Sequence, residues 1–436
     1  MDNYEFINLV FENITVYVLC VVFTGLIIFS LKAVRKKSAL DPLYYNAIYF
    51  IFATSTPLFL WVEEKIDFHF VLYFYVLSIA GFYLFMSFNR GAMNEKIIVK
   101  KSDKIHFYFA FLFYFGLTGF SYYKFGIPLF SENRIGLYTD SGGYGFISRI
   151  NPYLFTILLF FSLERIFRNK HVMCIKNYLY YVTILLLAIT GVMSGSRSWV
   201  INMMIGLYLY FLFFQGKEIY LNKKLALFAV FFVLIMFYRG DAANLNTSVI
   251  ALVTRVFMNG DSYFMALPND VFREISSGSS LRHLFSVFFV PLRIISSTAE
   301  LDPMGVTLAK YHYPSLEGFF GPNSTPSVYS YFLFQDYGFI FIFLNFLIGG
   351  LLAFRISKTF PKTFMGMVIR SKFYLIGISF LADTSYALSA LFDFIFFLFW
   401  WCSLEFIILI LKYRTRNSAY SFANGSSESS LPIHRS

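Results

Sequence analysis

Arginines are the residues of this sequence best suited to chemistry on a negatively charged group. Arg134, Arg197 and Arg239 each lie in a polar stretch beside an apolar run. A guanidinium keeps its charge, and its planar donors pair two-pronged with phosphate or carboxylate oxygens, whereas lysine is a point charge. Arg197 also precedes an apolar run whose first backbone N–H groups would help to hold an anion if that run is a helix. We predict that these three arginines hold an anionic group, such as the diphosphate of a lipid at the membrane boundary.

Single arginines have a second interpretation. A long basic side chain can snorkel to a membrane interface or form an ion pair with an acidic loop residue such as Asp241, Asp261, Glu274 or Asp302. For any one arginine we favour this structural role. For the whole set we favour anion binding; the set is Arg134, Arg149, Arg197, Arg239, Arg255, Arg273, Arg282 and Arg293.

Several titratable residues of the polar stretches could act as a general base. Asp241 lies close to Arg239, and His312 lies in Lys310-Tyr-His-Tyr-Pro314, but no spacing singles out either residue from Glu132, Asp140 and Glu317. A lone histidine is more often a hydrogen-bonded loop residue than a base. The three cysteines, Cys20, Cys174 and Cys402, form no spaced pair. We therefore predict no metal site, no disulfide framework and no cofactor.

The elements that must position these residues are apolar helices. Hydrophobic residues make up 58% of the 436-residue chain and charged residues 14%, and the apolar runs are long enough to cross a bilayer. We predict an all-α polytopic membrane protein with about eleven (ten to twelve) spans in one domain over residues 1–416, followed by a disordered tail over 417–436. The spans are expected near 11–31, 45–62, 69–88, 105–125, 152–167, 178–194, 199–215, 224–238, 331–354, 372–390 and 392–411.

Basic residues gather in alternate connections between these spans, and they account for most of the net charge of +11. The positive-inside rule places such connections in the cytoplasm, so the N-terminus is expected outside and the C-terminus inside the membrane that the chain spans. Because the charges are dispersed through short connectors, we predict no nucleic-acid partner. Two large loops then lie on the external face, at 126–151 and 239–330, and the apolar stretch 283–297 predicts an interfacial helix in the second.

Taken together, these features resemble the Wzy family of O-antigen and oligosaccharide repeat-unit polymerases. The span layout with two large periplasmic loops is similar over nearly the whole chain, and Ser194-Gly195-Ser196-Arg197 is similar to a short Gly-Ser-Arg element of that family. Arg134 and Gly145, with ten residues between them, resemble a motif of the periplasmic loops. The counterpart in the second loop, Arg293 to Gly305, has eleven intervening residues and departs from that pattern.

The resemblance implies a glycosyltransferase reaction on the periplasmic face. A growing glycan would move from undecaprenyl diphosphate to a new lipid-linked repeat unit, with Arg134, Arg197, Arg239, Asp241 and His312 in catalysis and Gly145 and Arg293 in substrate binding. The implied partners are undecaprenyl diphosphate-linked oligosaccharide, membrane lipid, a chain-length regulator and other polysaccharide assembly proteins.

Two alternatives stay open. A lipid-linked oligosaccharide flippase or transporter would use ionisable residues within the spans, for which Asp383, Asp393 and Glu405 are the candidates. The lack of an internal repeat and the asymmetric long loop weigh against it. An O-antigen ligase is the other alternative, because ligases resemble the polymerases in layout and are thought to use a histidine of an external loop, here His312.

Overall fold

Every regular element in the described part of the chain is a helix. The computed structural model describes residues 1–35, 38–89, 104–130, 145–168, 177–195, 199–220, 254, 256–275, 280–290, 292, 294–295, 301–314 and 321–425. Five helical stretches within them are long and apolar enough to cross a membrane: Pro42–Val62, Phe68–Ser87, Gly145–Arg168, Pro326–Thr359 and Thr384–Ile407. A sixth span results if α1 (Asn3–Glu12) and α2 (Ile14–Phe29), which meet at 93°, are taken as one. The all-helical class is confirmed for this part, whereas eleven spans with two large loops stay a prediction.

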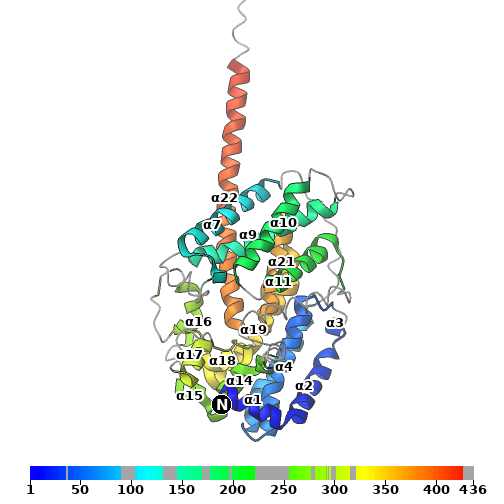
Figure 1. Ribbon diagram of the computed structural model, residues 1–436, viewed down its shortest axis with the longest axis vertical. Helices are drawn as coiled ribbons and strands as arrows, with labels where there is room; N and C mark the ends of the chain where they lie inside the picture. The colour runs from blue at the N-terminus through cyan, green and yellow to red at the C-terminus, as the bar shows by residue number, and fades with distance from the viewer. Residues whose placement is uncertain are drawn as a thin grey trace, which may run out of the picture.

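The helices form two groups that meet in the middle of the molecule (Figure 1). The group around the N-terminus contains α1, α2, α3 (Lys32–Arg35), α4 (Pro42–Val62), α5 (Phe68–Phe70), η1 (Val71–Val76), α6 (Leu77–Ser87), η6 (Met258–Gly260), α14 (Asp261–Ala266), η7 (Pro268–Asp270), α15 (Val271–Ile275), α16 (Ser280–Phe289), α17 (Met304–His312), α18 (Pro326–Phe334), η9 (Gln335–Gly338), α19 (Phe339–Leu351), η10 (Leu352–Ile356) and α20 (Ser357–Thr359). The other group contains α7 (Lys104–Phe125), η3 (Pro128–Phe130), α9 (Gly145–Arg168), α10 (Tyr178–Met193), α11 (Trp199–Tyr210), η5 (Phe211–Gln215), α21 (Phe364–Ser379) and α22 (Thr384–Gly425). One hydrophobic core lies wholly within the N-terminal group, and the larger core contains buried residues of both groups.

The buried carboxylate of Asp41 ties helices from both groups together. It caps α4 by accepting the N–H of Leu43 at 2.9 Å, and it also accepts the hydroxyls of Tyr208 at 2.9 Å and Tyr374 at 2.7 Å. Asp41 is fully buried, and burial of a carboxylate is tolerated when its oxygens are hydrogen-bonded. One side chain thereby fixes the relative positions of α4, α11 and α21.

The described part of the second predicted loop includes a segment that packs inside the bundle. All six residues of α14 are buried, and the Phe264 ring stacks on Phe6 of α1 at 4.0 Å between ring centroids. The hydroxyls of Ser262 and Tyr263 bond those of Thr325 and Ser327, at 3.0 and 2.9 Å. These bonds satisfy polar groups that burial would otherwise leave without partners, so the segment can enter an apolar core.

The last two helices meet at residues 380–383, about ten residues before the predicted junction near 391. Asp383 caps α22, because its Oδ1 atom accepts the N–H of Tyr386 at 2.9 Å. The preceding Phe380 and Leu381 are buried apolar residues, so hydropathy alone does not reveal this turn. Beyond the bundle α22 continues to Gly425 and projects away from the N-terminal end (Figure 1).

Candidate functional site

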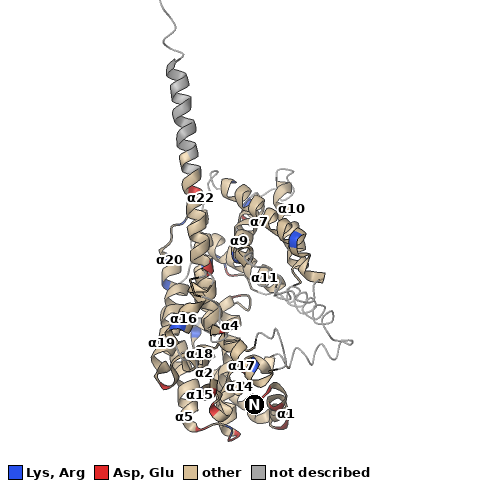
Figure 2. Cartoon of the chain, turned by 90° about the vertical axis from the view of Figure 1, so that its left-hand side faces the viewer, with Lys and Arg blue, Asp and Glu red and all other residues tan. Residues whose placement is uncertain are grey.

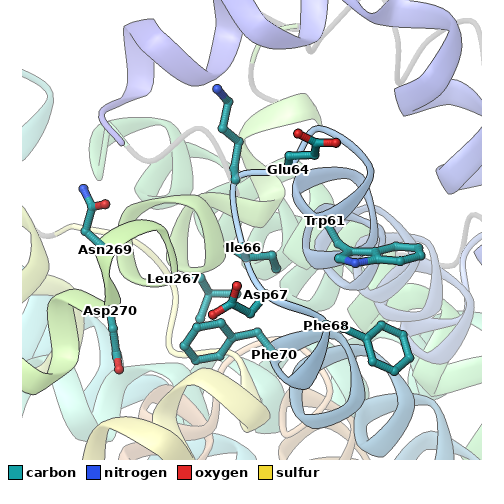
Figure 3. A pocket seen from close by; sticks show the side chains of 10 residues that line it. Trp61, Glu64, Ile66, Asp67, Phe68, Phe70, Leu267, Asn269 and Asp270 are labelled. Atoms are coloured by element: carbon teal, nitrogen blue, oxygen red, sulfur yellow. The ribbon is translucent and has the colours of Figure 1, made fainter.

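A cavity of about 450 Å³ opens at the end of the bundle that holds the N-terminus (Figure 3). Its volume falls within the range of roughly 300 to 1,000 Å³ that is common for small-molecule sites. Two short connections supply its walls, one between α4 and α5 and one between α14 and α15. The lining residues are Trp61, Glu64, Lys65, Ile66, Asp67, Phe68, Phe70, Leu267, Asn269 and Asp270.

Left-handed backbone conformations concentrate at this cavity. In the described chain, four residues other than glycine have positive φ angles, and Glu64 (55°), Asn269 (64°) and Asp270 (48°) all line the cavity. The fourth, Gln335, precedes Asp336 of a neighbouring cavity. A left-handed residue costs roughly 1–2 kcal/mol unless it is glycine, asparagine or aspartate. Glu64 is therefore the cavity residue that carries this strain, and backbone strain is found at many functional sites.

Aromatic rings and carboxylates line the same space. The rings of Trp61 and Phe68 lie 5.5 Å apart between centroids, and both side chains are exposed. In the described chain, no protein donor binds the carboxylates of Glu64 and Asp67. Exposed rings offer flat apolar surface, and ionised carboxylates accept hydrogen bonds from hydroxyl groups. This combination suits a ligand with apolar faces and many hydroxyls.

Asp270 is the carboxylate of the cavity whose protein partners hold it in place. Its Oδ2 atom pairs with Nε of Arg273 at 2.6 Å, and the Tyr331 hydroxyl lies 3.2 Å from each of its two oxygens. Tyr331 in turn lines a second cavity of about 280 Å³ with His69, Phe70, Leu72, Tyr73, Leu77 and Asp336. Phe70 lines both spaces, so the two cavities are neighbours on this face of the molecule.

His312, a predicted catalytic residue, packs against α14 beside this site and does not line the cavity. Its Nε2 atom lies 2.8 Å from the carbonyl oxygen of Met265. Since a carbonyl only accepts, Nε2 carries the proton and Nδ1 carries the lone pair of the neutral ring. Burial lowers the pKa of His312, while the bond to Met265 acts in the opposite direction. The imidazole is therefore neutral near pH 7, the form that a general base requires.

Most of the other predicted site residues lie outside the described residues. These are Arg134, Arg197, Arg239, Asp241 and Arg293. Gly145 is described and is the first residue of α9. The predicted anion site of the periplasmic arginines therefore stays a prediction.

A second polar cluster lies between α9, α21 and α22. Arg149 forms an ion pair with Asp393, and its guanidinium lies 5.8 Å from the centroid of the Phe392 ring. Lys372 donates to the carbonyl of Pro152 at 3.4 Å and lies 5.1 Å above the Tyr153 ring. Two cations and one carboxylate leave the cluster with surplus positive charge, which can attract an anionic group such as a phosphate. Lys372, the first residue of the expected span 372–390, lies within α21.

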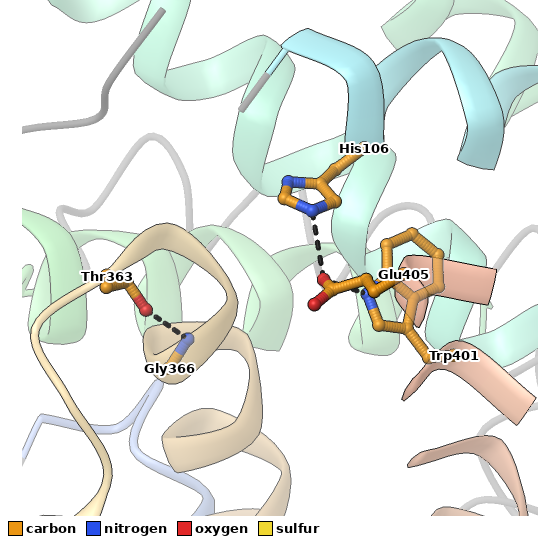
Figure 4. A network of polar contacts seen from close by, with 5 residues as sticks. All are labelled: His106, Thr363, Gly366, Trp401 and Glu405. Carbon is orange, nitrogen blue, oxygen red and sulfur yellow. Dashed lines mark hydrogen bonds and ion pairs between the residues drawn. The ribbon is translucent and has the colours of Figure 1, made fainter. Parts of the chain in front are cut away.

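The partly exposed side chain of Glu405 pairs with residues of α7 and of its own helix. Its Oε1 atom lies 3.0 Å from Nε2 of His106 and accepts the indole N–H of Trp401 at 2.9 Å (Figure 4). Near it, Thr363 caps α21 by accepting the N–H of Gly366 at 3.1 Å (Figure 4). These contacts attach α22 to α7, so a structural role accounts for Glu405.

Sequence reasoning missed the cavity residues. The stretch Trp61-Val-Glu-Glu-Lys-Ile-Asp67 carries a signal, because it places an indole and three acids in a short connection between two spans. Asn269 and Asp270 carry no such signal, because the fold alone brings them beside that connection.

The described fold and these sites define a helical protein of the membrane-spanning type, with a cavity at one end of its bundle. No family model, curated protein or solved structure matches the chain.

Proposed function

We propose that this protein is a polymerase of lipid-linked oligosaccharides. It would transfer a growing glycan from undecaprenyl diphosphate to a new lipid-linked repeat unit on the outer face of a bacterial inner membrane. The observation that carries the proposal is the cavity beside Trp61 and Phe68, where exposed rings adjoin carboxylates with no described protein donor. Carbohydrates present apolar ring faces and hydroxyl donors, so the lining supports a sugar ligand.

The cations between α9, α21 and α22 support the part of the proposal that concerns the lipid-linked diphosphate. In the transfer, the bond from the sugar anomeric carbon to the diphosphate breaks, and the acceptor hydroxyl oxygen bonds to that carbon. A base takes the hydroxyl proton, and the diphosphate leaves with its lipid. Preorganised cations stabilise the charge that develops on the leaving group. Arg149 and Lys372 would act on this charge together with the predicted arginines Arg134, Arg197 and Arg239.

Lipopolysaccharide from a strain that lacks this gene tests the proposal. We expect a gel pattern of core plus a single repeat unit, which full-length protein restores to a ladder and Arg197→Ala does not. We expect Asp270→Asn to shorten the ladder as well, because the change removes one partner of Arg273. Asp302→Asn is the matched control, since Asp302 pairs with Lys310 on the surface and does not line the cavity.

The same gel separates the alternatives. Loss of every repeat unit in the deletion strain would contradict a polymerase and indicate a flippase or a ligase. An unchanged ladder would contradict all three. Immunoblots of membrane fractions must show equal amounts of each variant, so that poor insertion is not read as lost activity.

A further inference from the structure

The cavity beside α4 and α5 carries an excess of negative charge. Three of its lining residues are acidic, Glu64, Asp67 and Asp270, and one is basic, Lys65. Arg273 pairs with Asp270 from outside the lining and leaves the other two carboxylates exposed. Figure 2 shows that acidic residues gather at this end of the bundle, around the N-terminus, α5 and α15. A ligand that enters the cavity therefore meets a negative potential.

The acidic residues are spread around the cavity. In the described chain, no group of three histidine, cysteine, aspartate or glutamate side chains could hold a metal ion. Asp67 points to the middle of the site near Leu267 and Phe70, while Glu64 and Asp270 lie on different sides of it (Figure 3). Spacing of this kind suits several separate hydrogen bonds to one extended ligand, because each carboxylate can accept from a different hydroxyl.

We propose that this cavity is a subsite for a sugar without a carboxylate, and that it prefers an amino sugar to a neutral sugar and a neutral sugar to a uronic acid. A uronate would place its charge beside Glu64 and Asp67, whereas an ammonium group would be attracted to both. The inference rests on the proposed function in one respect, namely that this sugar would belong to the lipid-linked repeat unit. This preference for a cationic sugar also distinguishes the cavity from the predicted arginine site, which would accept anionic groups.

The size of the preference follows from solvent exposure. Both carboxylates are exposed, so each acts through a high dielectric and through screening salt. One charge contact at about 4 Å then changes a dissociation constant by a factor of about five. We expect about that ratio between amino and neutral sugar and a similar ratio between neutral sugar and uronate. Both ratios should shrink as salt concentration rises.

Three matched probes test the proposal: the methyl glycosides of glucosamine, glucose and glucuronic acid. Each is titrated at pH 7 into the full-length protein in lipid nanodiscs, and binding is followed by tryptophan fluorescence. Trp61 is one of four tryptophans, and Trp61→Phe identifies its part of the signal. We expect the tightest binding for glucosamine and the weakest for glucuronic acid. Asp67→Asn should reduce each ratio about twofold or more, while Asp302→Asn leaves the ratios unchanged.

Equal binding of glucuronic acid and glucosamine would overturn the proposal, and so would the absence of saturable binding for all three probes. Saturation-transfer NMR on the same nanodiscs detects weak binding that leaves the fluorescence unchanged. The probes carry no lipid and undergo no transfer, so their binding does not depend on polymerase activity. Selective binding together with an unchanged lipopolysaccharide ladder in the deletion strain would support the subsite and contradict the proposed function.

Discussion

At the scale of single residues, Glu64 brings a strained backbone conformation and a carboxylate to the same cavity. Glu64 adopts a φ of 55° directly after the end of α4, although a glutamate side chain gains nothing from this conformation locally. Its neighbour Lys65 donates its N–H to the carbonyl of Leu60 at 2.8 Å, which closes the turn. The turn needs one left-handed residue at this point, and the chain has glutamate there instead of glycine.

The substitution Glu64→Gly tests whether the strained backbone of Glu64 lowers the stability of the protein. We expect the variant to be more stable by up to about 1 kcal/mol, because glycine adopts a positive φ without strain. It should also bind methyl glucosaminide more weakly. Thermal unfolding in detergent and the sugar titration measure the two effects. Lys65→Gly is the control and should lower stability, because its φ is not positive and glycine adds freedom to the unfolded chain. A less stable Glu64→Gly protein would contradict the interpretation.

His312 predicts a pH dependence of stability. Burial lowers the pKa of its side chain below the ordinary value of about 6.5, so the unfolded chain binds a proton at a higher pH than the folded chain does. The contribution of His312 to stability is therefore fully present above that ordinary pKa, and it is lost as the pH drops below it. We expect the melting temperature to fall more between pH 7.5 and 5.5 in the wild type than in His312→Gln, whose side chain does not titrate. Identical profiles would contradict this prediction.

At the scale of helices, close packing depends on glycines at crossing points. A Cβ atom on Gly377 of α21 would lie 2.4 Å from the backbone nitrogen of Ala353 and 2.5 Å from the carbonyl oxygen of Gly349. Backbone atoms cannot move aside as a flexible side chain can. The crossing of α19 and η10 with α21 thus requires a residue without a side chain, as is common between membrane helices.

We expect Gly377→Ala to destabilise the protein by about 1–3 kcal/mol, the usual cost of overpacking. Gly116→Ala is the matched control, because a Cβ atom on this glycine of α7 meets nothing within 4 Å. Alanine should stabilise α7 there by up to about 1 kcal/mol. Melting temperatures in one detergent compare the two variants. Equal effects would show that the crossing of α19 and α21 is looser than described.

The Arg149 and Asp393 pair is expected to couple α9 to α22. Their side chains are 31% and 23% exposed, so the pair lies between a buried and a surface ion pair. Removal of one partner alone should cost about 2 kcal/mol, because the other charge stays in the bundle. The double variant Arg149→Leu with Asp393→Leu should cost less than the sum of the two single variants. Melting temperatures of all four proteins complete the cycle, and strict additivity would contradict the coupling.

At the scale of the whole molecule, the contacts between connecting segments form two sets, one on each expected side of the membrane. Asn13 donates to Glu63 at 2.8 Å, and the backbone N–H of Asn3 donates to the Tyr313 hydroxyl at 2.9 Å. Asn13 lies at the outer end of the expected span 11–31, and the other three residues lie in segments that the positive-inside rule places outside. In the other set, Ser38 donates to the carbonyl of Ile219 at 2.6 Å, and the rule places both of these residues inside. Contacts within each set agree with the predicted grouping of these connections on two sides of the bundle, and the orientation in the membrane stays a prediction.

Cysteine labelling tests that topology. In a chain without its three native cysteines, we expect Glu64→Cys to react with a membrane-impermeant maleimide in spheroplasts. Lys217→Cys should react only after the membrane is broken, because its connection is basic and expected in the cytoplasm. Both residues are exposed, so access to the reagent and not burial decides the result. The reverse pattern would invert the orientation and would place the cavity on the cytoplasmic side.

The sequence by itself determined the helical class and the position of most described helices. Long apolar runs leave no other way to satisfy the backbone in lipid, and charge asymmetry between connections predicts orientation. Local patterns also account for the capping role of Asp41. Hydropathy misplaced the turn at Asp383, because the apolar residues Phe380, Leu381 and Ala382 join the apolar runs on either side of it.

Only the tertiary structure decided the sites. Asn269 and Asp270 reach the connection at Glu64 because α14 folds into the core, and no sequence period encodes that contact. Arg149 and Asp393 are 244 positions apart in the chain and form an ion pair. Lys372 and Tyr153, which are also far apart in the sequence, lie side by side. Such pairs depend on how helices pack, which is set by the summed shape of many side chains. The sequence therefore supplied the residue types, and packing decided which of them act together.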